Sequence, residues 1–419
     1  MDAAVFERYE SQVRSYCRNF PAVFKTAKGS MLYDVDGGAY IDFLSCAGSL
    51  NYGHNHPELT KCMTQYLESD MILNAMDMYT EAKEIFISAF VNKILVPRSM
   101  DYRLMFTGPT GTNAVEAAAK LARKVKKRSR ILALMGAYHG MTLGALALST
   151  DLVSRQGSGV PLDNVTHIPA PYMIGEQQAL DYIEMIINDD HSGLEHPAAL
   201  ILETLQAEGG MEVLSDSYLK AVSEICKKYD MLLIIDDIQV GCGRTGTFFS
   251  FERAGIDPDM VTLSKSISGS GLPMALLLIK PEYDIWLPAE HNGTFRGNQL
   301  AFVSATRALD LIQEENIFNE TIRKGALAEE FFQNEIAPLD GRLIYRGLGL
   351  AAGIDYIKFD PTGAFAKKVQ GICFKKGLIV ERVGRQNAVI KILPPLNIPD
   401  ELLLGGLGIM RDATREALG

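Results

Sequence analysis

The sequence predicts an α/β fold in which a mostly parallel β-sheet is covered by helices. Short apolar runs recur through the middle of the chain, and helical patterns lie between several of them. This alternation is typical of parallel strands joined by crossover helices. The strand-like runs are ILAL (131–134), AALILE (198–203), MLLIID (231–236), MVTL (260–263) and MALLLI (274–279).

The helical patterns and the chain ends complete this prediction. Amphipathic spacing predicts helices over 113–127 and 216–230, while DVDGGAYIDF (34–43) indicates two short strands around a Gly-Gly turn. Beyond about residue 305 we expect two long helical stretches, a strand-like segment at 347–357 and a final helix.

These elements predict one large α/β domain and a smaller lobe built from both termini. The predicted boundaries are 1–55 for the N-terminal part of the small lobe, 56–304 for the large domain and 305–419 for the C-terminal part. With 419 residues, 47% of them hydrophobic, the chain is long enough for such a division.

Composition excludes several classes of function. The net charge of −10 disfavours extensive binding to a nucleic-acid backbone. No uncharged apolar stretch reaches the roughly 18 residues that a membrane crossing needs, and MDAAVFERYE at the start lacks the regions of a signal peptide. We expect a cytoplasmic protein with free thiols, because six cysteines are scattered without CxxC spacing: Cys17, Cys46, Cys62, Cys226, Cys242 and Cys373.

The most informative residue is Lys265, in the turn-rich run TLSKSISGSGLP (262–273). Lys265 lies 29 residues downstream of Asp236, which ends an apolar strand-like run. Pyridoxal phosphate (PLP) chemistry requires such a pair, since a desolvated lysine amine forms an imine with the aldehyde and an aspartate keeps the pyridine nitrogen protonated. A lysine in a polar turn is more often a solvated surface residue, so the motif alone does not decide the function.

A phosphate site is indicated at GPTGTNAVEAA (108–118), where glycines precede a strong helical pattern. Free backbone N–H groups and the positive helix end lie beside Gly111 and Thr112. An ordinary helix cap explains the same residues equally well, because Asn113 and Glu116 have capping-box spacing.

Tyr138, in GAYHGMT (136–142), follows a predicted strand and a glycine. Its ring is therefore a candidate to lie against a flat cofactor, although an isolated Tyr-His pair is more often part of the packing.

Two other motifs are weaker. GCGRTG (241–246) matches the glycine pattern of dinucleotide-binding folds, but the aromatic, turn-rich segment after it does not read as the required helix. His54 and His56 lack further ligands at zinc spacing, so we expect no metal site.

The order of motifs along the chain resembles the class III, ornithine- and 4-aminobutyrate-type aminotransferases over nearly the whole length. The resemblance implies a PLP enzyme of fold-type I, with a seven-stranded type of sheet and a homodimer or higher multiple whose active sites are shared between subunits. The motifs are DVDGGAYIDF, GHNHP (53–57), GPTGTNAVEAA, AYHGMT, ETLQAEGG (203–210), LLIIDDIQVGCGRTG, TLSKS, GTFRGNQ (293–299) and IKILPPL (390–396).

The resemblance implies roles at the cofactor ring. Lys265 would form the imine and move a proton, and Asp236 would pair with the pyridine nitrogen. Tyr138 would stack on the ring, and Gln239 would lie near the ring hydroxyl.

The resemblance also implies the phosphate contacts. Gly111 and Thr112 would bind the phosphate from the same chain, whereas Thr294 would reach the phosphate of the neighbouring subunit. The last role requires a dimer.

The chain departs from many relatives where they bind carboxylates. Met141 and Lys391 stand where relatives carry arginines. Neither residue provides the planar bidentate fork of a guanidinium. Arg296 is the expected replacement, with Lys391 as a point charge, and Glu208 matches the glutamate that neutralises the terminal arginine when an amine substrate binds.

Within the family, the motifs are similar to the L-2,4-diaminobutyrate 4-aminotransferases of ectoine and siderophore pathways. That similarity implies ping-pong transfer of an amino group from glutamate to L-aspartate 4-semialdehyde, or the reverse. Alternatives are ornithine, 4-aminobutyrate or another diamine as substrate, a PLP racemase or decarboxylase, and a non-catalytic binding protein with the same fold.

Overall fold

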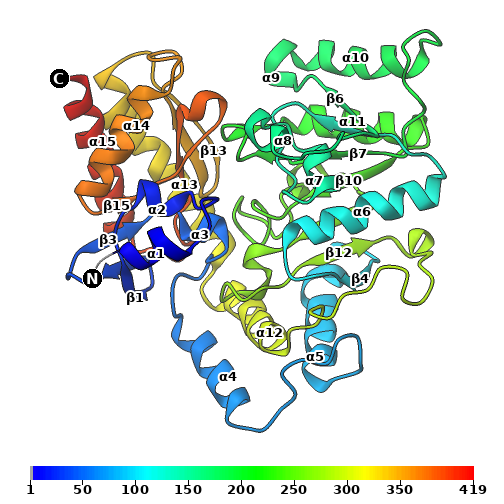
Figure 1. Ribbon diagram of the computed structural model, residues 1–419, viewed down its shortest axis with the longest axis horizontal. Coiled ribbons are helices and arrows are strands. Elements are labelled where there is room, and N and C mark those ends of the chain that lie inside the picture. Colours follow the sequence, from blue (N-terminus) through cyan, green and yellow to red (C-terminus); the bar gives the residue numbers. More distant parts are fainter. Residues whose placement is uncertain (1–2) are drawn as a thin grey trace.

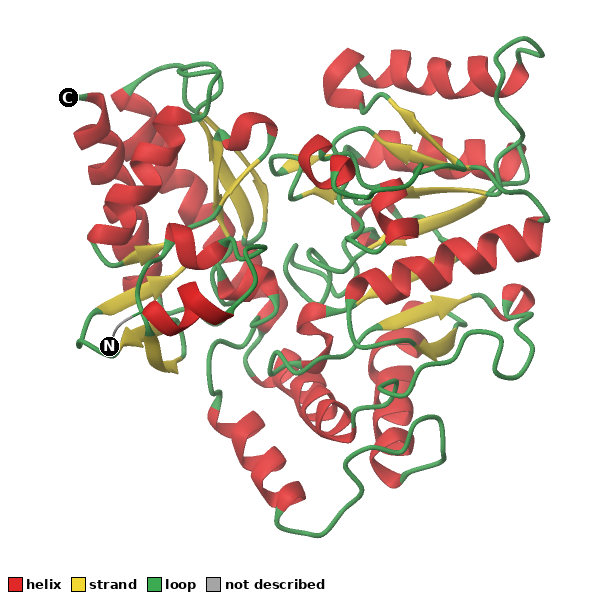
Figure 2. Ribbon diagram, viewed as in Figure 1, coloured by secondary structure: helices red, strands yellow, loops and turns green. Residues whose placement is uncertain are grey.

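The computed structural model describes residues 3–419 and is organised around a seven-stranded β-sheet (Figures 1 and 2). In spatial order the strands are β4 (Arg103–Phe106), β12 (Leu276–Ile279), β11 (Met260–Leu263), β10 (Leu232–Asp236), β7 (Ala199–Leu202), β5 (Ile131–Leu134) and β6 (Val165–Ile168). From β11 to β6 all neighbours are parallel, whereas β12 is antiparallel to both β11 and β4. The predicted mostly parallel sheet is confirmed.

Both faces of this sheet are buried, because successive side chains along a strand enter two separate hydrophobic cores. In β10, Leu233 and Ile235 pack into one core, and Leu232 and Ile234 pack into the other. The near-continuous apolar runs of the sequence follow from this double covering. The first core includes α5 (Glu81–Phe90), α10 (Glu176–Asn188), α11 (Asp216–Lys228) and α12 (Gln299–Glu314), and the second includes α6 (Gly111–Lys126) and α7 (Leu143–Leu148).

Shorter elements complete the large domain. Helix α4 (Pro57–Leu67) packs against α12, and the two-stranded β8–β9 pair lies after the carboxyl end of β7. The remaining elements are α3 (Ser45–Gly48), α8 (Leu152–Gln156), α9 (Pro171–Ile174), β8 (Leu205–Gln206) and β9 (Glu212–Val213).

The smaller lobe combines both ends of the chain and lies beside the large domain in Figure 1. One of its sheets contains β1 (Phe24–Lys28), β2 (Met31–Asp34), β3 (Ala39–Asp42) and β15 (Leu378–Ile379), and the other contains β13 (Ile344–Leu348), β14 (Ala351–Asp355), β17 (Val389–Ile392) and β16 (Arg382–Val383). Its helices are α1 (Ala4–Tyr9), α2 (Tyr16–Asn19), α13 (Ile317–Phe331), α14 (Ala364–Lys375) and α15 (Asp400–Leu418). The exact domain boundaries stay a prediction.

The structure differs from the predicted elements in the C-terminal region. The segment 347–357 is not one strand, because the chain reverses at Gly349, whose φ of +60° is left-handed, and forms the β13–β14 hairpin. Helix α14 was not predicted, and α12 begins before residue 305. The N-terminal prediction holds, since β2 and β3 pair around the Gly-Gly turn.

Two further sequence expectations concern thiols and membranes. All six cysteines lie in the described part of the chain and are free. Among residues 3–419, no helix combines the length and the apolar character that a membrane crossing requires.

Candidate active site

A cavity of about 250 Å³ lies at the carboxyl ends of the parallel strands. Ligands bind at this edge of open α/β sheets, near the point where the strand order reverses. Here the reversal falls at β5, with β6 on one side and β7 on the other. The lining residues follow β4, β5, β7, β10 and β11: Thr110, Gly111, Thr112, Tyr138, His139, Gly140, Met141, Glu203, Glu208, Asp236, Ile238, Gln239, Val240 and Lys265.

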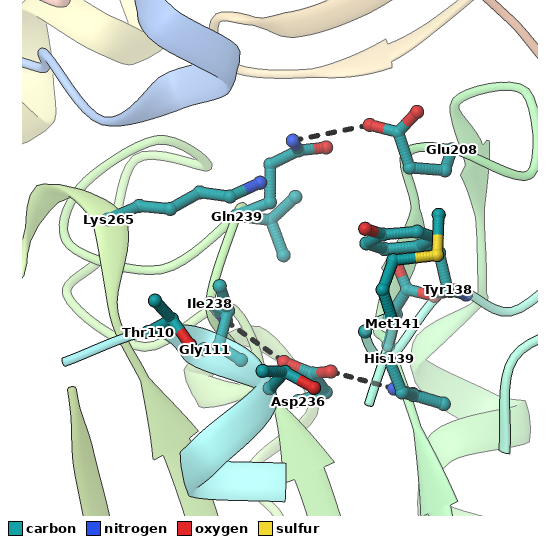
Figure 3. A pocket seen from close by; sticks show the side chains of 14 residues that line it. Thr110, Gly111, Tyr138, His139, Met141, Glu208, Asp236, Ile238, Gln239 and Lys265 are labelled. Atoms are coloured by element: carbon teal, nitrogen blue, oxygen red, sulfur yellow. Dashed lines mark hydrogen bonds and ion pairs between the residues drawn. The ribbon is translucent and has the colours of Figure 1, made fainter. Parts of the chain in front are cut away.

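Lys265 enters the cavity from the turn after β11, opposite Tyr138 (Figure 3). Its backbone is left-handed, with φ of 51°, a conformation that is strained for a residue with a side chain. Burial lowers the pKa of the Lys265 amine to about 8, although the Glu208 carboxylate opposes that shift. The amine is therefore neutral far more often than that of a solvated lysine.

Asp236 ends β10 and is fixed by three hydrogen bonds. Its Oδ2 lies 2.7 Å from His139 Nδ1, and its Oδ1 accepts from Thr262 Oγ1 at 3.0 Å and from the Ile238 N–H at 3.2 Å. Burial opposes a charge on His139, but the hydrogen bond and charge of Asp236 outweigh it and raise the His139 pKa. The carboxylate thus has a set orientation toward the cavity floor (Figure 3).

His139 and Glu203 were not among the predicted site residues. Glu203 Oε1 accepts the Tyr138 N–H at 2.9 Å, and burial raises the Glu203 pKa to about 7. Each residue carries a sequence signal, because His139 directly follows Tyr138 in GAYHGMT and Glu203 directly follows β7 at the start of ETLQAEGG.

Gly111 and Thr112 form the first turn of α6, whose N-terminus faces the cavity. The cap differs from the predicted one. Asn113 is the third helical residue and its Oδ1 accepts the Thr110 N–H at 3.4 Å. Glu116 instead accepts hydrogen bonds from Thr142 Oγ1, in the loop before α7, at 2.6 Å and from the Gly144 N–H, in the first turn of α7, at 2.9 Å.

Thr112 is tied to that same loop by a hydrogen bond of 2.7 Å between its Oγ1 and Thr142 Oγ1. Gly111 packs so closely on Ile238 that an added Cβ would lie 2.9 Å from Ile238 Cδ1. The helix end is therefore fixed on both sides, and its free N–H groups are available to an anion.

The Gln239 side chain lies between Ala47 and Glu208 and contacts both. Its Nε2 donates to the Ala47 carbonyl at 3.0 Å and approaches Glu208 Oε1 at 3.4 Å. Its Oε1 is buried and has no hydrogen-bond partner within the described chain. Buried polar atoms usually have a hydrogen-bond partner, so this oxygen is a candidate acceptor for a hydroxyl group of a bound ligand.

Lys391 lies behind the cavity wall on β17, and its side chain is fully buried. Its Nζ pairs with Glu208 at 2.6 Å and with Glu381 at 2.9 Å. The two carboxylates outweigh burial and raise the Lys391 pKa. Glu381 was not predicted, because no local motif marks it.

Thr294 and Arg296 lie in the loop between β12 and α12, apart from the residues that line the cavity. Arg296 pairs with Asp77 at 2.5 Å and donates to the His291 carbonyl at 3.2 Å. The predicted phosphate contact of Thr294 requires a neighbouring subunit. That role and the predicted carboxylate-binding role of Arg296 stay predictions. Met141 does line the cavity, and 54% of its surface is exposed.

The weaker motifs have structural roles. Arg244 of GCGRTG is fully buried and donates to Asn51 Oδ1 at 2.6 Å and to the Leu350 carbonyl at 3.1 Å, so it joins the two domains. His54 pairs with Asp42 at 2.8 Å, and His56 pairs with Glu315 at 2.7 Å.

Comparisons with known proteins agree with this geometry. A family model described as aminotransferase class-III matches residues 13–414. Diaminobutyrate–2-oxoglutarate transaminase of Streptomyces avermitilis is 49% identical, with 99% of this chain and 98% of the relative covered. The protein of the same name from Bordetella parapertussis is 47% identical, with 100% and 96% covered.

Solved structures share the fold. An aminotransferase of Bacillus anthracis superposes with a TM-score of 0.87 at 26% identity, over 99% of this chain and 97% of that one. Ornithine aminotransferase from Toxoplasma gondii superposes with a TM-score of 0.85 at 24% identity, over 99% and 94%.

Proposed function

The chain belongs to the class III aminotransferases, and from that premise we propose that it exchanges an amino group between glutamate and L-aspartate 4-semialdehyde. The products are 2-oxoglutarate and L-2,4-diaminobutyrate, and the reaction is reversible. The main observation that supports this type of reaction is that Lys265 and Asp236 line the same cavity. The substrate rests on relatives of 47–49% identity that are named for it.

The cofactor is pyridoxal phosphate, and the cavity fits it. The N-terminus of α6 offers free N–H groups for the phosphate, and Asp236 would face the ring nitrogen. The unpartnered Oε1 of Gln239 would accept the ring hydroxyl. When bound, the cofactor supplies an electron sink for the charge left when the substrate Cα–H bond breaks.

Lys265 is the group that moves the proton. Its lowered pKa means that the amine is available as a base near neutral pH, whereas a solvated lysine is almost wholly protonated there. Tyr138, held through its N–H by Glu203, would keep the flat ligand against the cavity wall.

Glu208 and Lys391 would adapt the site to two different substrates. An amine substrate without a carboxylate at that end leaves the Glu208–Lys391 ion pair intact. Glutamate carries an α-carboxylate, which would displace Glu208 and pair with the Lys391 ammonium. One cavity then serves both half-reactions, and ping-pong kinetics follow.

A homodimer with shared active sites is part of the proposal. The loop with Thr294 and Arg296 also carries Phe295, which is 68% exposed. The segment before α5 exposes further apolar surface at Leu73 and Tyr79. A second copy of the chain would cover this surface and place Thr294 beside the phosphate. Ectoine or siderophore biosynthesis in the cytoplasm is the proposed setting.

The absorption spectrum tests the proposed function. The purified protein is loaded with PLP, and spectra are recorded before and after glutamate, and after L-2,4-diaminobutyrate in a fresh sample. We expect both donors to convert the band of lysine-bound cofactor. A response to glutamate alone would reject the diaminobutyrate assignment. No band after PLP addition would mean that Lys265 does not bind the cofactor, and it would overturn the whole proposal.

A further inference from the structure

The ion-pair cluster around Lys391 has two carboxylates where neutralising one lysine needs only one. We propose that Glu381, held by Tyr16, is the fixed partner that keeps Lys391 in place and charged when Glu208 releases it to bind the α-carboxylate of glutamate. Glu381 is thus a positioning residue for the glutamate half-reaction. This inference rests on the proposed function, in which Glu208 is the partner that leaves.

Glu381 is attached to Lys391 at two points. Its backbone carbonyl accepts the Lys391 N–H at 2.8 Å, and its Oε2 pairs with Lys391 Nζ at 2.9 Å. Its other oxygen, Oε1, accepts the Tyr16 hydroxyl at 2.7 Å. Its side chain is 14% exposed. Both carboxylate oxygens are engaged, so this partner has little freedom to move away.

Glu208 differs in each of these respects. Its side chain is 30% exposed and lines the cavity. Besides Lys391 it has a side-chain contact with Gln239 at 3.4 Å, a long distance for a hydrogen bond. Both contacts use Glu208 Oε1, and the one with Lys391 is the shorter. The Glu208 carboxylate is therefore held mainly by Lys391, and a competing carboxylate can replace it.

The need for a second carboxylate follows from the lysine itself. A guanidinium stays charged when buried, but a fully buried ammonium with no anion beside it loses its proton. Without Glu381, the departure of Glu208 would leave the buried Lys391 ammonium with no carboxylate of the protein beside it. Burial would then favour loss of its proton at the moment when the substrate carboxylate arrives. The other titratable groups that interact with this cluster include Lys265, Tyr138, Glu203 and Tyr16.

The expected effect is confined to one half-reaction. In Glu381→Gln the shape and the Tyr16 hydrogen bond remain, but the charge is lost and the Lys391 pKa falls. We expect the glutamate KM to rise about tenfold at neutral pH, as for loss of a charge-assisted hydrogen bond. The deficit should grow with pH, because the protonated form of Lys391 is lost as pH rises. With diaminobutyrate, Glu208 stays in place and the change should be below about threefold.

The test measures each half-reaction of the PLP-loaded enzyme separately by stopped-flow absorbance from pH 6.5 to 9. Tyr16→Phe is the second variant and should move the glutamate KM in the same direction by less. Glu416→Gln is the matched control, since it removes a lysine–carboxylate pair of 3.1 Å with Lys376 elsewhere in the small lobe.

Equal losses with both donors, or a glutamate KM that is independent of pH in Glu381→Gln, would overturn the inference. If Glu381→Gln failed to retain PLP, Tyr16→Phe would decide by the same criteria. If the wild-type enzyme does not react with diaminobutyrate, the proposed substrate is wrong. The pH dependence of the glutamate reaction would still test the role of Glu381.

Discussion

The two ends of the cavity are built in different ways. At the cofactor end, Asp236 is the last residue of β10, Lys265 lies two residues after β11, and Tyr138 lies in the loop after β5. At the substrate end, Lys391 and Glu381 come from the small lobe, and Glu208 comes from the loop between β8 and β9. The cofactor end is thus set by one rigid sheet, whereas the substrate end depends on how two domains meet.

Removing the lysine at the cofactor end should have the largest effect. We expect Lys265→Ala to lower turnover by about 10⁴-fold or more, because the proton-moving base and the covalent attachment disappear together. Steady-state transamination is the measurement, with circular dichroism to check the fold. Activity near that of the wild type would remove the central claim for this end of the cavity.

The second largest effect is expected at Asp236, the residue proposed to face the ring nitrogen of the cofactor. Asp236→Asn should lower turnover by about 10²–10³-fold, the range for removing a preorganised electrostatic partner. Asp237→Asn is the matched control, since Asp237 is the adjacent buried aspartate but binds the Ser250 N–H instead. Similar losses in both variants would mean that this stretch acts through stability alone.

The Lys265 pKa predicts how cofactor loading depends on pH. Since only the neutral amine attacks the aldehyde, loading of the apoprotein should slow about tenfold per pH unit below the pKa. Burial places that pKa at about 8, so the rate should rise as pH increases and level off above 8. A rate that continues to climb toward pH 10 would show that the lysine is solvated.

The cofactor end could be predicted from sequence because its residues follow directly on apolar strands. The runs that became β5, β10 and β11 were recognisable, so the neighbours Tyr138, Asp236 and Lys265 were too. The strand positions also brought Glu208 and Gln239 into the same cavity.

The substrate end could not be predicted in the same way. Glu381 belongs to no motif, and its role appears only when β16 and β17 pair and Tyr16 approaches from the far end of the chain. Arg296 is expected to bind a carboxylate of the substrate, and that role stays a prediction; within the chain its guanidinium pairs with the Asp77 carboxylate. Contacts between segments remote in sequence leave no periodic pattern to detect.

Glu208→Gln probes the substrate end with a moderate expected effect. Glu208 neutralises Lys391 when diaminobutyrate binds, so its loss should lower kcat/KM for that donor by about tenfold. The glutamate KM should stay the same or fall, because the substrate carboxylate no longer competes with Glu208. This pattern is the reverse of that expected for Glu381→Gln. A higher glutamate KM in Glu208→Gln would contradict the exchange of partners.

The smallest effect is expected at Thr294, which is proposed to contact the phosphate of the neighbouring subunit. Thr294→Ala should weaken PLP retention by about fivefold, the value of one neutral hydrogen bond. Retention is measured by dialysis followed by cofactor absorbance, alongside the oligomeric state from light scattering. A PLP-saturated monomer would refute the shared site.

The pairing of β3 with β15 has a consequence for synthesis on the ribosome. Ile41 lies opposite Leu378 and donates its N–H to the Gly377 carbonyl at 2.8 Å, so the first sheet of the small lobe stays open at one edge until nearly the whole protein has been made. At about 5–20 residues per second, the intervening roughly 340 residues take roughly 20–70 s. During that interval the nascent N-terminal hairpin presents an unpaired strand edge, and the large domain has time to fold first.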